Sequence, residues 1–564
     1  MSVIGKIFFD PKHRKRGLIL AFTIFGISVS VITTTVVLHL TNQVQKFPKF
    51  KTQPDLPTQP LTTYQESKSW TFPDEGNNFQ NSTCAVSGNN WVVTENQKPG
   101  VDLKESDWRQ VDFKYAAGSA LWIDRTSANC GDTIKVHASL YMPKIFGFVK
   151  GKRTIHVLRI GWYNGSGARE VWSSSPISLK TFKINKPVNN LRMVETTWPT
   201  TLQFTIGADW TPGFYLVVSE DPNGKFENAA PFVLHAPLGS SKIILMHSFL
   251  TWNLYNTFGN RSAYLGSGDN VATRREDRSR VVSLDRPIIG SGGYSIHRDG
   301  ISMVQFLEKS GFDFDQVSDF DLDTNPSIVK SYNELILSGH AEYMTRRIFE
   351  GVIAARNDGV NLAIFGGNTA LWQTRTTESP TGKNRRIIMY RSATEDPVSD
   401  LRQVTIEFAN HRLNMPQSLF TGTHPNGTHV YGNLKSVKIP SWLPLPSYAS
   451  IDGISPDSEI EASSQGSEAA PPKVNIILSG NMNYADPTTK PAGKPLHPES
   501  DVVWFTDENG QATFNAGITT WACDLVDTCA YSSVDDKSRQ VLDTITKTVV
   551  TLWQERKIGA KLTN

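Results

Sequence analysis

The chain has 564 residues, and its 57 lysines and arginines nearly balance 54 aspartates and glutamates, which leaves a formal net charge of +3. This length is enough for two or three domains with large apolar cores. The near-neutral balance, without a basic stripe, argues against a nucleic acid as a partner.

The N-terminus combines a basic cluster with a long apolar run. Residues 1–16 end in the cluster Lys12–Arg16, and residues 17–40 form the uncharged stretch GLILAFTIFGISVSVITTTVVLHL. This stretch can cross roughly 30 Å of hydrocarbon, and it is longer than a signal-peptide core and lacks a nearby cleavage site. We therefore expect a single-pass membrane anchor at 17–40, with the lipid bilayer as a partner. The basic residues 1–16 would remain cytoplasmic and the C-terminal bulk would be extracytoplasmic.

The next two regions differ in composition. Residues 41–83 are polar and interrupted by prolines, which predicts an extended, Pro-rich stalk. Between residues 84 and 238, short strand-like segments such as Lys135–Met142 and His156–Tyr163 lie between turn sequences. Their spacing suits a β-sandwich, and GADWTPG at Gly207–Gly213 resembles part of immunoglobulin-like modules. We expect an immunoglobulin-like β domain over residues 84–238.

Four cysteines, all beyond the apolar run, indicate disulfide bonds in an oxidising compartment. Their order predicts two local pairs, Cys84 with Cys130 and Cys523 with Cys529, although four cysteines allow three connectivities. A zinc site is less expected, because neither pair has the C-x2-C spacing.

From residue 239 to 564 the pattern changes to an α/β domain. The runs KIILMHS, NELILS, NLAIFGG, RIIMYRS and NIILSG are apolar on both faces, as expected of strands that helices cover. Ile348–Ile353 carries one apolar helix face, which Thr345 can cap, and a last helix is expected at about 536–557. Because residues 451–472 are acidic, rich in serine and poor in apolar side chains, they predict a disordered insert.

His340 and Glu342 follow one of these apolar runs. The run Leu335–Leu337 is short enough for a buried strand, and Ser338 and Gly339 end it. An imidazole and a carboxylate therefore lie just past the carboxyl end of a strand, which is where ligands bind in open α/β sheets. Such a pair suits a metal site or acid–base catalysis.

The sequence around this pair resembles a known family, the C-terminal domain of the N,N-dimethylformamidase large (beta) subunit and its relatives. Its segments, in order, are TWNLYNTFGNRSAY (Thr251–Tyr264), SLDRP (Ser283–Pro287), SDFDLDTNP (Ser318–Pro326), SGHAEYMT (Ser338–Thr345), GVNLAIFGGNTALWQTR (Gly359–Arg375) and FNAGITTWACDL (Phe514–Leu525). The resemblance implies an immunoglobulin-like β-sandwich followed by a class I glutamine-amidotransferase-like α/β domain with a mostly parallel sheet.

The resemblance also implies a metal site. In N,N-dimethylformamidase, two tyrosines and a glutamate hold a mononuclear iron, and an essential histidine lies two residues before that glutamate. His340 and Glu342 match this pair, so the resemblance implies Glu342 as an iron ligand and His340 as the catalytic residue. Tyr255 and Tyr264 are the best matches for the tyrosines, because they follow the strand KIILMHS. Phenolate and carboxylate oxygens are hard ligands that suit ferric iron.

The chain departs from the family pattern at one position. Many relatives have a tyrosine after the DRP motif, where this chain has Ile288, and Tyr294 could replace one ligand. Asp321 and Asp323 could bind Mg²⁺ or Ca²⁺, but we expect them to cap a turn. We expect three residues after the strand NLAIFGG to line the substrate cleft: Asn368, Trp372 and Gln373.

Two functional hypotheses follow. The chain has no cysteine between Cys130 and Cys523 and no G-x-S-x-G motif, which excludes the thiol catalysis of glutamine amidotransferases and leaves a serine hydrolase without its nucleophile turn. The first hypothesis is an iron-dependent hydrolase of an amide or related C–N bond in an envelope component. The alternative is a non-catalytic cell-envelope binding or scaffolding protein that retains the fold.

Overall fold

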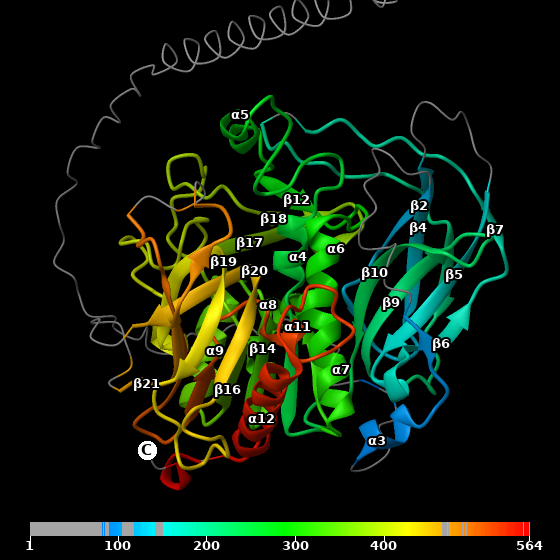
Figure 1. Cartoon of the computed structure of the whole chain (residues 1–564). Coiled ribbons are helices and arrows are strands. Elements are labelled where there is room, and N and C mark those ends of the chain that lie inside the picture. Colours follow the sequence, from blue (N-terminus) through cyan, green and yellow to red (C-terminus); the bar gives the residue numbers. More distant parts are fainter. Residues whose placement is uncertain are drawn as a thin grey trace, which may run out of the picture. The chain divides into compact units, whose positions relative to one another are not determined.

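The structure, a computed structural model, describes most of the chain beyond residue 89 (Figure 1). The described residues are 82, 84, 90–103, 118–141, 151–188, 190–464, 471, 473–487, 490, 493–556 and 558–562. The predicted cytoplasmic tail (1–16), anchor (17–40) and, except for Ser82, stalk (41–83) lie outside them.

The membrane predictions need correction. In the part of the chain that the structure describes, no helix is long and apolar enough to cross a bilayer. The expected anchor, the lipid bilayer as a partner and the single-pass topology with an extracytoplasmic bulk are therefore not supported.

The N-terminal part of the described chain consists of two β-sheets. The larger sheet has the order β1-β6-β5-β9-β10-β3, with β7 paired to β5, and the smaller has the order β2-β4-β8. The bounds are β1 Val101–Asp102, β2 Gly118–Ile123, β3 Ser127–Ala128, β4 Thr133–Tyr141, β5 Gly151–Ile160, β6 Gly167–Ser173, β7 Ile177–Leu179, β8 Leu202–Thr205, β9 Gly213–Glu220 and β10 Phe226–Leu234.

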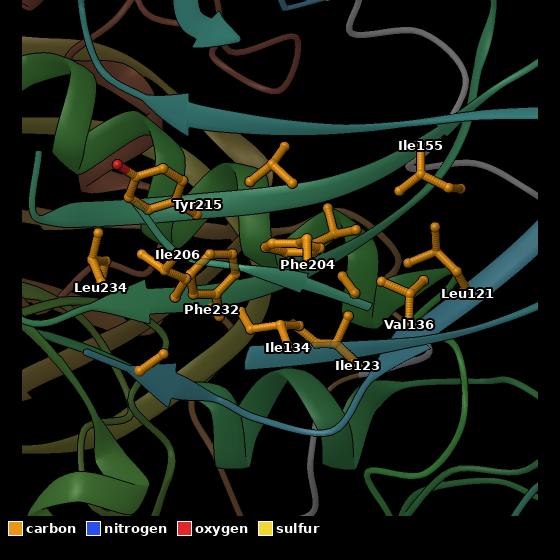
Figure 2. Packing of buried hydrophobic residues seen from close by; sticks show 14 of the residues in the cluster. Leu121, Ile123, Ile134, Val136, Ile155, Phe204, Ile206, Tyr215, Phe232 and Leu234 are labelled. Carbon is orange, nitrogen blue, oxygen red and sulfur yellow. The ribbon is translucent and has the colours of Figure 1, made fainter. Parts of the chain in front are cut away.

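Apolar side chains from both sheets form one core (Figure 2). Ile134 and Val136 of the smaller sheet lie in the same cluster as Val157, Tyr215 and Phe232 of the larger sheet. Alternate residues of a strand point to one face, so each strand contributes every second side chain. Full burial of such a side chain stabilises the fold by roughly 1.5–3 kcal/mol.

Both predicted disulfides are present, Cys84–Cys130 and Cys523–Cys529. The first belongs to the core shared by the two sheets. The second closes a short loop after helix α11 (Trp521–Asp524). The pairing that the cysteine order predicted is therefore confirmed.

A ten-stranded sheet forms the centre of the C-terminal part, in the order β13-β11-β14-β16-β24-β23-β21-β19-β20, with β22 paired to β19. The strands β13, β11, β14, β16 and β24 run parallel. The bounds of these parallel strands are β11 Ile243–His247, β13 Asp315–Ser318, β14 Glu334–Gly339, β16 Asn361–Gly366 and β24 Ala512–Asn515.

The other half of this sheet is antiparallel, which corrects the predicted fold class. The strands are β19 Thr423–Ser436, β20 Ser450–Ser463, β21 Asn475–Asn481, β22 Asn483–Tyr484 and β23 Glu499–Thr506. The prediction of a glutamine-amidotransferase-like domain with a mostly parallel sheet is therefore wrong, since the sheets are mixed and strands predominate over helices. Apolar runs such as NIILSG show that a strand is buried, but they do not show the direction of its neighbours.

The disordered insert predicted at residues 451–472 is also incorrect over its first part, because Ser450–Ser463 forms the long strand β20. Ile454 and Ile460 of this strand are buried, and so is Glu461. Its acidic and serine residues suggested a solvated loop, but the Glu461 carboxylate accepts hydrogen bonds from Thr423 and Asn515 within the fold.

A separate four-stranded sheet has the order β12-β18-β17-β15. Its strands are β12 Val281–Ser283, β15 Tyr343–Thr345, β17 Trp372–Ser379 and β18 Gly382–Ile388, so the run RIIMYRS extends from an antiparallel strand of this sheet. The longer helices are α7 Ser302–Lys309, α9 Arg346–Asn357 and α12 Asp536–Trp553. Both predicted helices are confirmed, and the Thr345 hydroxyl accepts a hydrogen bond from Ile348 N as its cap.

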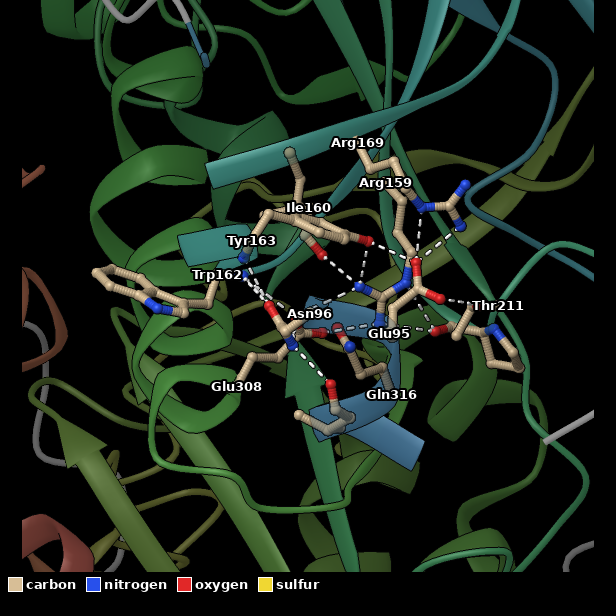
Figure 3. Close-up of polar contacts among 12 residues, drawn as sticks. Glu95, Asn96, Arg159, Ile160, Trp162, Tyr163, Arg169, Thr211, Glu308 and Gln316 are labelled. Atoms are coloured by element: carbon tan, nitrogen blue, oxygen red, sulfur yellow. Dashed lines mark hydrogen bonds and ion pairs between the residues drawn. The ribbon is translucent and has the colours of Figure 1, made fainter. Parts of the chain in front are cut away.

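A buried polar cluster joins the larger of the two β-sheets to the C-terminal part (Figure 3). Arg159 of β5 is fully buried and donates to Glu308 of α7 at 2.7 Å. Glu95, in helix α3 (Trp91–Asn96), accepts from the Tyr163 hydroxyl at 2.8 Å and from Arg169 at 2.7 Å. Residues 69–564 form one compact unit, so the predicted division into domains at 84–238 and 239–564 stays a prediction.

Candidate active site

The predicted pair lies at the carboxyl edge of the parallel strands. β14 runs parallel to both β11 and β16 and ends at Gly339, so His340 and Glu342 follow directly at the edge where ligands bind. Gly339 has φ +65° and a Cβ there would collide with the Asp299 side chain, so the turn requires glycine. The loop after β16 runs alongside, since Trp372 N donates to Glu342 O at 3.0 Å.

The two tyrosines come from the segment after β11. Tyr255 is the last residue of helix α4 (Phe249–Tyr255), and Tyr264 follows in the next loop. Arg286 of the SLDRP segment fixes this loop by donating to the backbone carbonyls of Asn256, Phe258 and Arg261. Burial lowers the pKa of Arg286 to about 9. The motif therefore shapes the loop that carries both tyrosines.

Both phenols converge on the Glu342 carboxylate. The Tyr255 hydroxyl lies 2.8 Å from Oε2, and the Tyr264 hydroxyl lies 2.7 and 2.6 Å from Oε1 and Oε2. The two hydroxyls are 2.8 Å apart. Glu342 is 4% exposed, so this cluster of oxygens is shielded from bulk water on the side of the carboxylate. We call Tyr255, Tyr264 and Glu342 the oxygen cluster.

The oxygen cluster holds its protons tightly. Burial raises the pKa of Glu342, while the charge of Arg391 and hydrogen bonds from the phenols oppose this only in part. Burial, reinforced by the negative charge of Glu342, raises the pKa of Tyr255 well above its usual range. Burial raises the pKa of Tyr264 in the same way, although Arg391 opposes the effect. Each phenol therefore keeps its proton at neutral pH.

His340 lies beside this cluster as a neutral base. Its Nε2 atom is 3.4 Å from Glu342 Oε2 and 3.6 Å from Glu459 Oε2. This nitrogen is buried and has no hydrogen-bond partner among the described residues. Burial, with the positive charges of Arg298 and Arg391, lowers the pKa of His340 well below its usual range. The ring is therefore neutral, and its Nε2 atom is available for a hydrogen bond to a molecule in the site.

Glu459 is a site residue that the sequence did not reveal. It belongs to β20, which the composition had assigned to a disordered insert, and it accepts a hydrogen bond from Asn368 Nδ2. Burial, and then the charge of Glu342, raise the pKa of Glu459 to about 8. No local motif marks this glutamate, because only the pairing of β20 with distant strands brings it to His340.

The three residues expected to line a cleft have different positions. Asn368 contacts Glu459, and Trp372 lies next to Arg391, with 4.8 Å between the guanidinium carbon and the ring centroid. Gln373 is fully buried and donates to the backbone carbonyls of Leu401 and Val404. Gln373 therefore holds the neighbouring loop in place, whereas Asn368 and Trp372 border the site.

The alternative candidates lie apart from the oxygen cluster. Tyr294 packs edge-on against Tyr531, with ring centroids 3.8 Å apart. The Asp321 side chain caps helix α8 (Asp319–Thr324) together with Ser318. Asp323 accepts hydrogen bonds from Thr345 and Thr376. Asp321 thus caps a helix, in the kind of role expected for it, whereas Asp323 bonds to β15 and β17 and does not cap the predicted turn. Two others that join the site without having been predicted are Tyr343 and Arg391.

The oxygen cluster fits the iron that the resemblance implies. Among the described residues, no group of three or more histidines, cysteines, aspartates and glutamates could hold a metal. Phenols are a different donor type, and here two of them and one carboxylate converge within hydrogen-bond distance of one another. A trivalent or divalent cation stabilises phenolate and carboxylate oxygens strongly. Glu342, Tyr255 and Tyr264 are therefore the residues that would hold such an ion.

Comparison with known proteins identifies the family. Among curated proteins no match was found. One solved structure that was matched is a crystal structure of a Paenibacillus sp. cycloisomaltooligosaccharide glucanotransferase complexed with cycloisomaltoheptaose. Its sequence is 7% identical to this one, and the match covers 62% of this chain and 66%, just under two thirds, of the other chain. Its TM-score of 0.16 is too low to indicate a shared fold.

The family model described as N,N-dimethylformamidase beta subunit-like, C-terminal, matches residues 154–533, which confirms the resemblance. The chain belongs to this N,N-dimethylformamidase beta subunit-like, C-terminal family.

Proposed function

We propose that this protein hydrolyses an amide or related C–N bond with the help of an iron ion held by the oxygen cluster. Family membership supports a reaction of the amidohydrolase type. The observation that carries the proposal is the convergence of two phenols on one buried carboxylate beside a histidine whose Nε2 has no partner among the described residues. Bound iron would polarise the amide carbonyl and lower the pKa of a water molecule.

His340 has the position of the proton carrier. Its neutral Nε2 atom can take a proton as water attacks the carbonyl carbon, and can return it to the leaving nitrogen when the C–N bond breaks. Glu459 Oε2, 3.6 Å away, can orient the charged ring, and Asn368 holds this carboxyl group in place. Water adds its oxygen to the acyl carbon, and the amine leaves with the proton, so no oxidant or reductant is needed.

The first prediction concerns metal content and turnover. The full chain, purified without chelators, should contain about one iron per molecule by elemental analysis and release amine from simple formamides or acetamides. Glu342→Gln should lose the iron, because a neutral amide oxygen is a much weaker ligand than a carboxylate. His340→Gln should keep the iron but lower turnover roughly 10²–10⁴-fold, the usual contribution of a general acid–base.

Glu276→Gln provides a matched control, since Glu276 is exposed on helix α5 (Val271–Glu276). This variant should retain both iron and turnover. Equal iron content in the Glu342→Gln and unaltered chains would overturn the assignment of the metal ligands. Absence of iron and of amine release from the unaltered chain would favour the alternative, a non-catalytic binding protein that keeps the fold.

A further inference from the structure

Arg391 lies beside the oxygen cluster. It follows β18, with a left-handed φ of 57°, a conformation that non-glycine residues adopt only where the surroundings enforce it. Its guanidinium carbon lies 3.7 Å from the ring centroid of Tyr264 and 4.8 Å from that of Trp372. The side chain is 18% exposed, so part of it reaches solvent, and its guanidinium borders the oxygen cluster.

The positive charge of Arg391 is only weakly paired. The guanidinium donates to the Tyr343 hydroxyl, a neutral group, and the nearest Glu342 oxygen is 4.0 Å away, beyond hydrogen-bond distance. Glu342 already accepts from both phenols. The Nε atom of Arg391 is buried and has no hydrogen-bond partner among the described residues. This arginine therefore retains capacity for an anionic partner.

Several other arginines with little exposure bind a carboxylate directly, whereas the buried Arg286 donates to backbone carbonyls. The distances are 2.7 Å for Arg159 to Glu308, 2.5 Å for Arg385 to Asp285 and 2.8 Å for Arg375 to Asp396. Removing a guanidinium from water is costly unless its N–H groups are satisfied. Arg391, which lies beside the oxygen cluster, has no carboxylate at such a short distance among the described residues.

We infer that Arg391 binds a carboxylate on the substrate, so that the protein acts on N-acyl amino acids in preference to neutral amides. This inference rests on the proposed function of the oxygen cluster. A planar guanidinium pairs with a carboxylate through two parallel hydrogen bonds. Because Arg391 lies beside the oxygen cluster, a small molecule whose amide lies at the cluster can place a carboxylate against the guanidinium. Hydrolysis then adds water to the acyl carbon, breaks the C–N bond and transfers a proton to the released amino acid.

N-acetylglycine and N-acetylglycinamide test this inference, because they differ only in a carboxylate against a carboxamide. Calorimetric titration of the full chain should show N-acetylglycine binding at least about tenfold more tightly, as a charge-assisted pair requires. In Arg391→Gln the two probes should bind equally, and in Arg391→Lys part of the preference should remain. Arg402→Gln is the control, since it removes an exposed guanidinium and should leave the ratio unchanged.

Iron content and thermal melting of each variant show whether the site and the fold are retained. A ratio near one in the unaltered chain would overturn the inference, as would failure of both probes to bind. A preference that survives in Arg391→Gln would overturn it too. If the unaltered chain hydrolyses both probes equally and Glu342→Gln hydrolyses neither, the proposed function stands and this inference falls. If Glu342→Gln keeps its iron and the carboxylate preference still depends on Arg391, only the metal assignment falls.

Discussion

The oxygen cluster of Glu342, Tyr255 and Tyr264 is held together by protons, at the position where we propose that iron binds. Burial raises the pKa of both phenols well above its usual range, so the phenol protons that connect these oxygens remain bound at neutral pH, and burial also raises the pKa of Glu342. A metal ion can use these oxygens only if it displaces the protons, because phenolate and carboxylate are the ligand forms. Proton release and metal uptake are therefore expected to be coupled at this site.

The apparent affinity for iron should accordingly rise with pH. Because the pKa of each phenol is raised well above its usual range, iron competes with the phenol protons throughout the neutral range, and each displaced proton adds up to about tenfold in affinity per pH unit. Metal titrations at pH 6, 7 and 8 measure this slope. Tyr264→Phe should lower the slope because one fewer proton is displaced, whereas Tyr431→Phe, an exposed tyrosine, should not. A flat pH dependence would mean that the phenols are not ligands.

At the scale of elements, local patterns predicted some features and missed others. The apolar run before Ser338 correctly indicated strand β14, and Thr345 with the face at Ile348–Ile353 correctly indicated helix α9, because these signals depend on neighbouring residues. The strand β20 and its residue Glu459 were missed. Burial of acidic residues there depends on partners such as Asn368, which are far away in the sequence. Arg391 was missed for the same reason.

The turn after β14 gives a prediction about one element. Gly339→Ala combines a left-handed φ with a collision against Asp299, so it should destabilise the fold by more than about 2 kcal/mol and reduce turnover by moving His340. Gly131→Ala is the matched control, since φ there is +87° but a Cβ would have no neighbour within 4 Å. That variant should lower the free energy of unfolding by only about 1 kcal/mol, because the left-handed backbone conformation is its sole unfavourable feature. Urea unfolding of both variants checks the difference, and equal losses would contradict the steric argument.

At the scale of the whole molecule, the cluster around Arg159 connects the larger N-terminal sheet to the C-terminal part. The buried pair of Arg159 and Glu308 joins β5 to α7, while Glu95 connects α3 to Tyr163 and Arg169 (Figure 3). Removing one member of a buried ion pair leaves an uncompensated charge, which is far more costly than the loss of a surface pair. The helical turn Ile296–Ile301 continues directly into α7, and its Asp299 carbonyl accepts a hydrogen bond from Ser338 near the end of β14. The geometry of the site should therefore depend on this cluster.

Glu95 makes part of that connection sensitive to acid. Burial alone would raise its pKa, but the charge of Arg159 and hydrogen bonds from Lys98 and Thr211 lower the pKa to about 2, from an ordinary value of 4.5. A carboxyl group whose pKa is lowered by folding contributes stability above pH 4.5, and this contribution disappears as the pH falls towards 2. The contribution amounts to at most about 3 kcal/mol at pH 7.

Glu95→Gln should therefore lower the free energy of unfolding at pH 7, and the difference in this free energy between the variant and the unaltered chain should shrink at pH 3. Urea unfolding at the two pH values measures this free-energy difference, with Glu276→Gln as the exposed control. A free-energy difference that does not change with pH would show that the ionised form of Glu95 does not hold the cluster together.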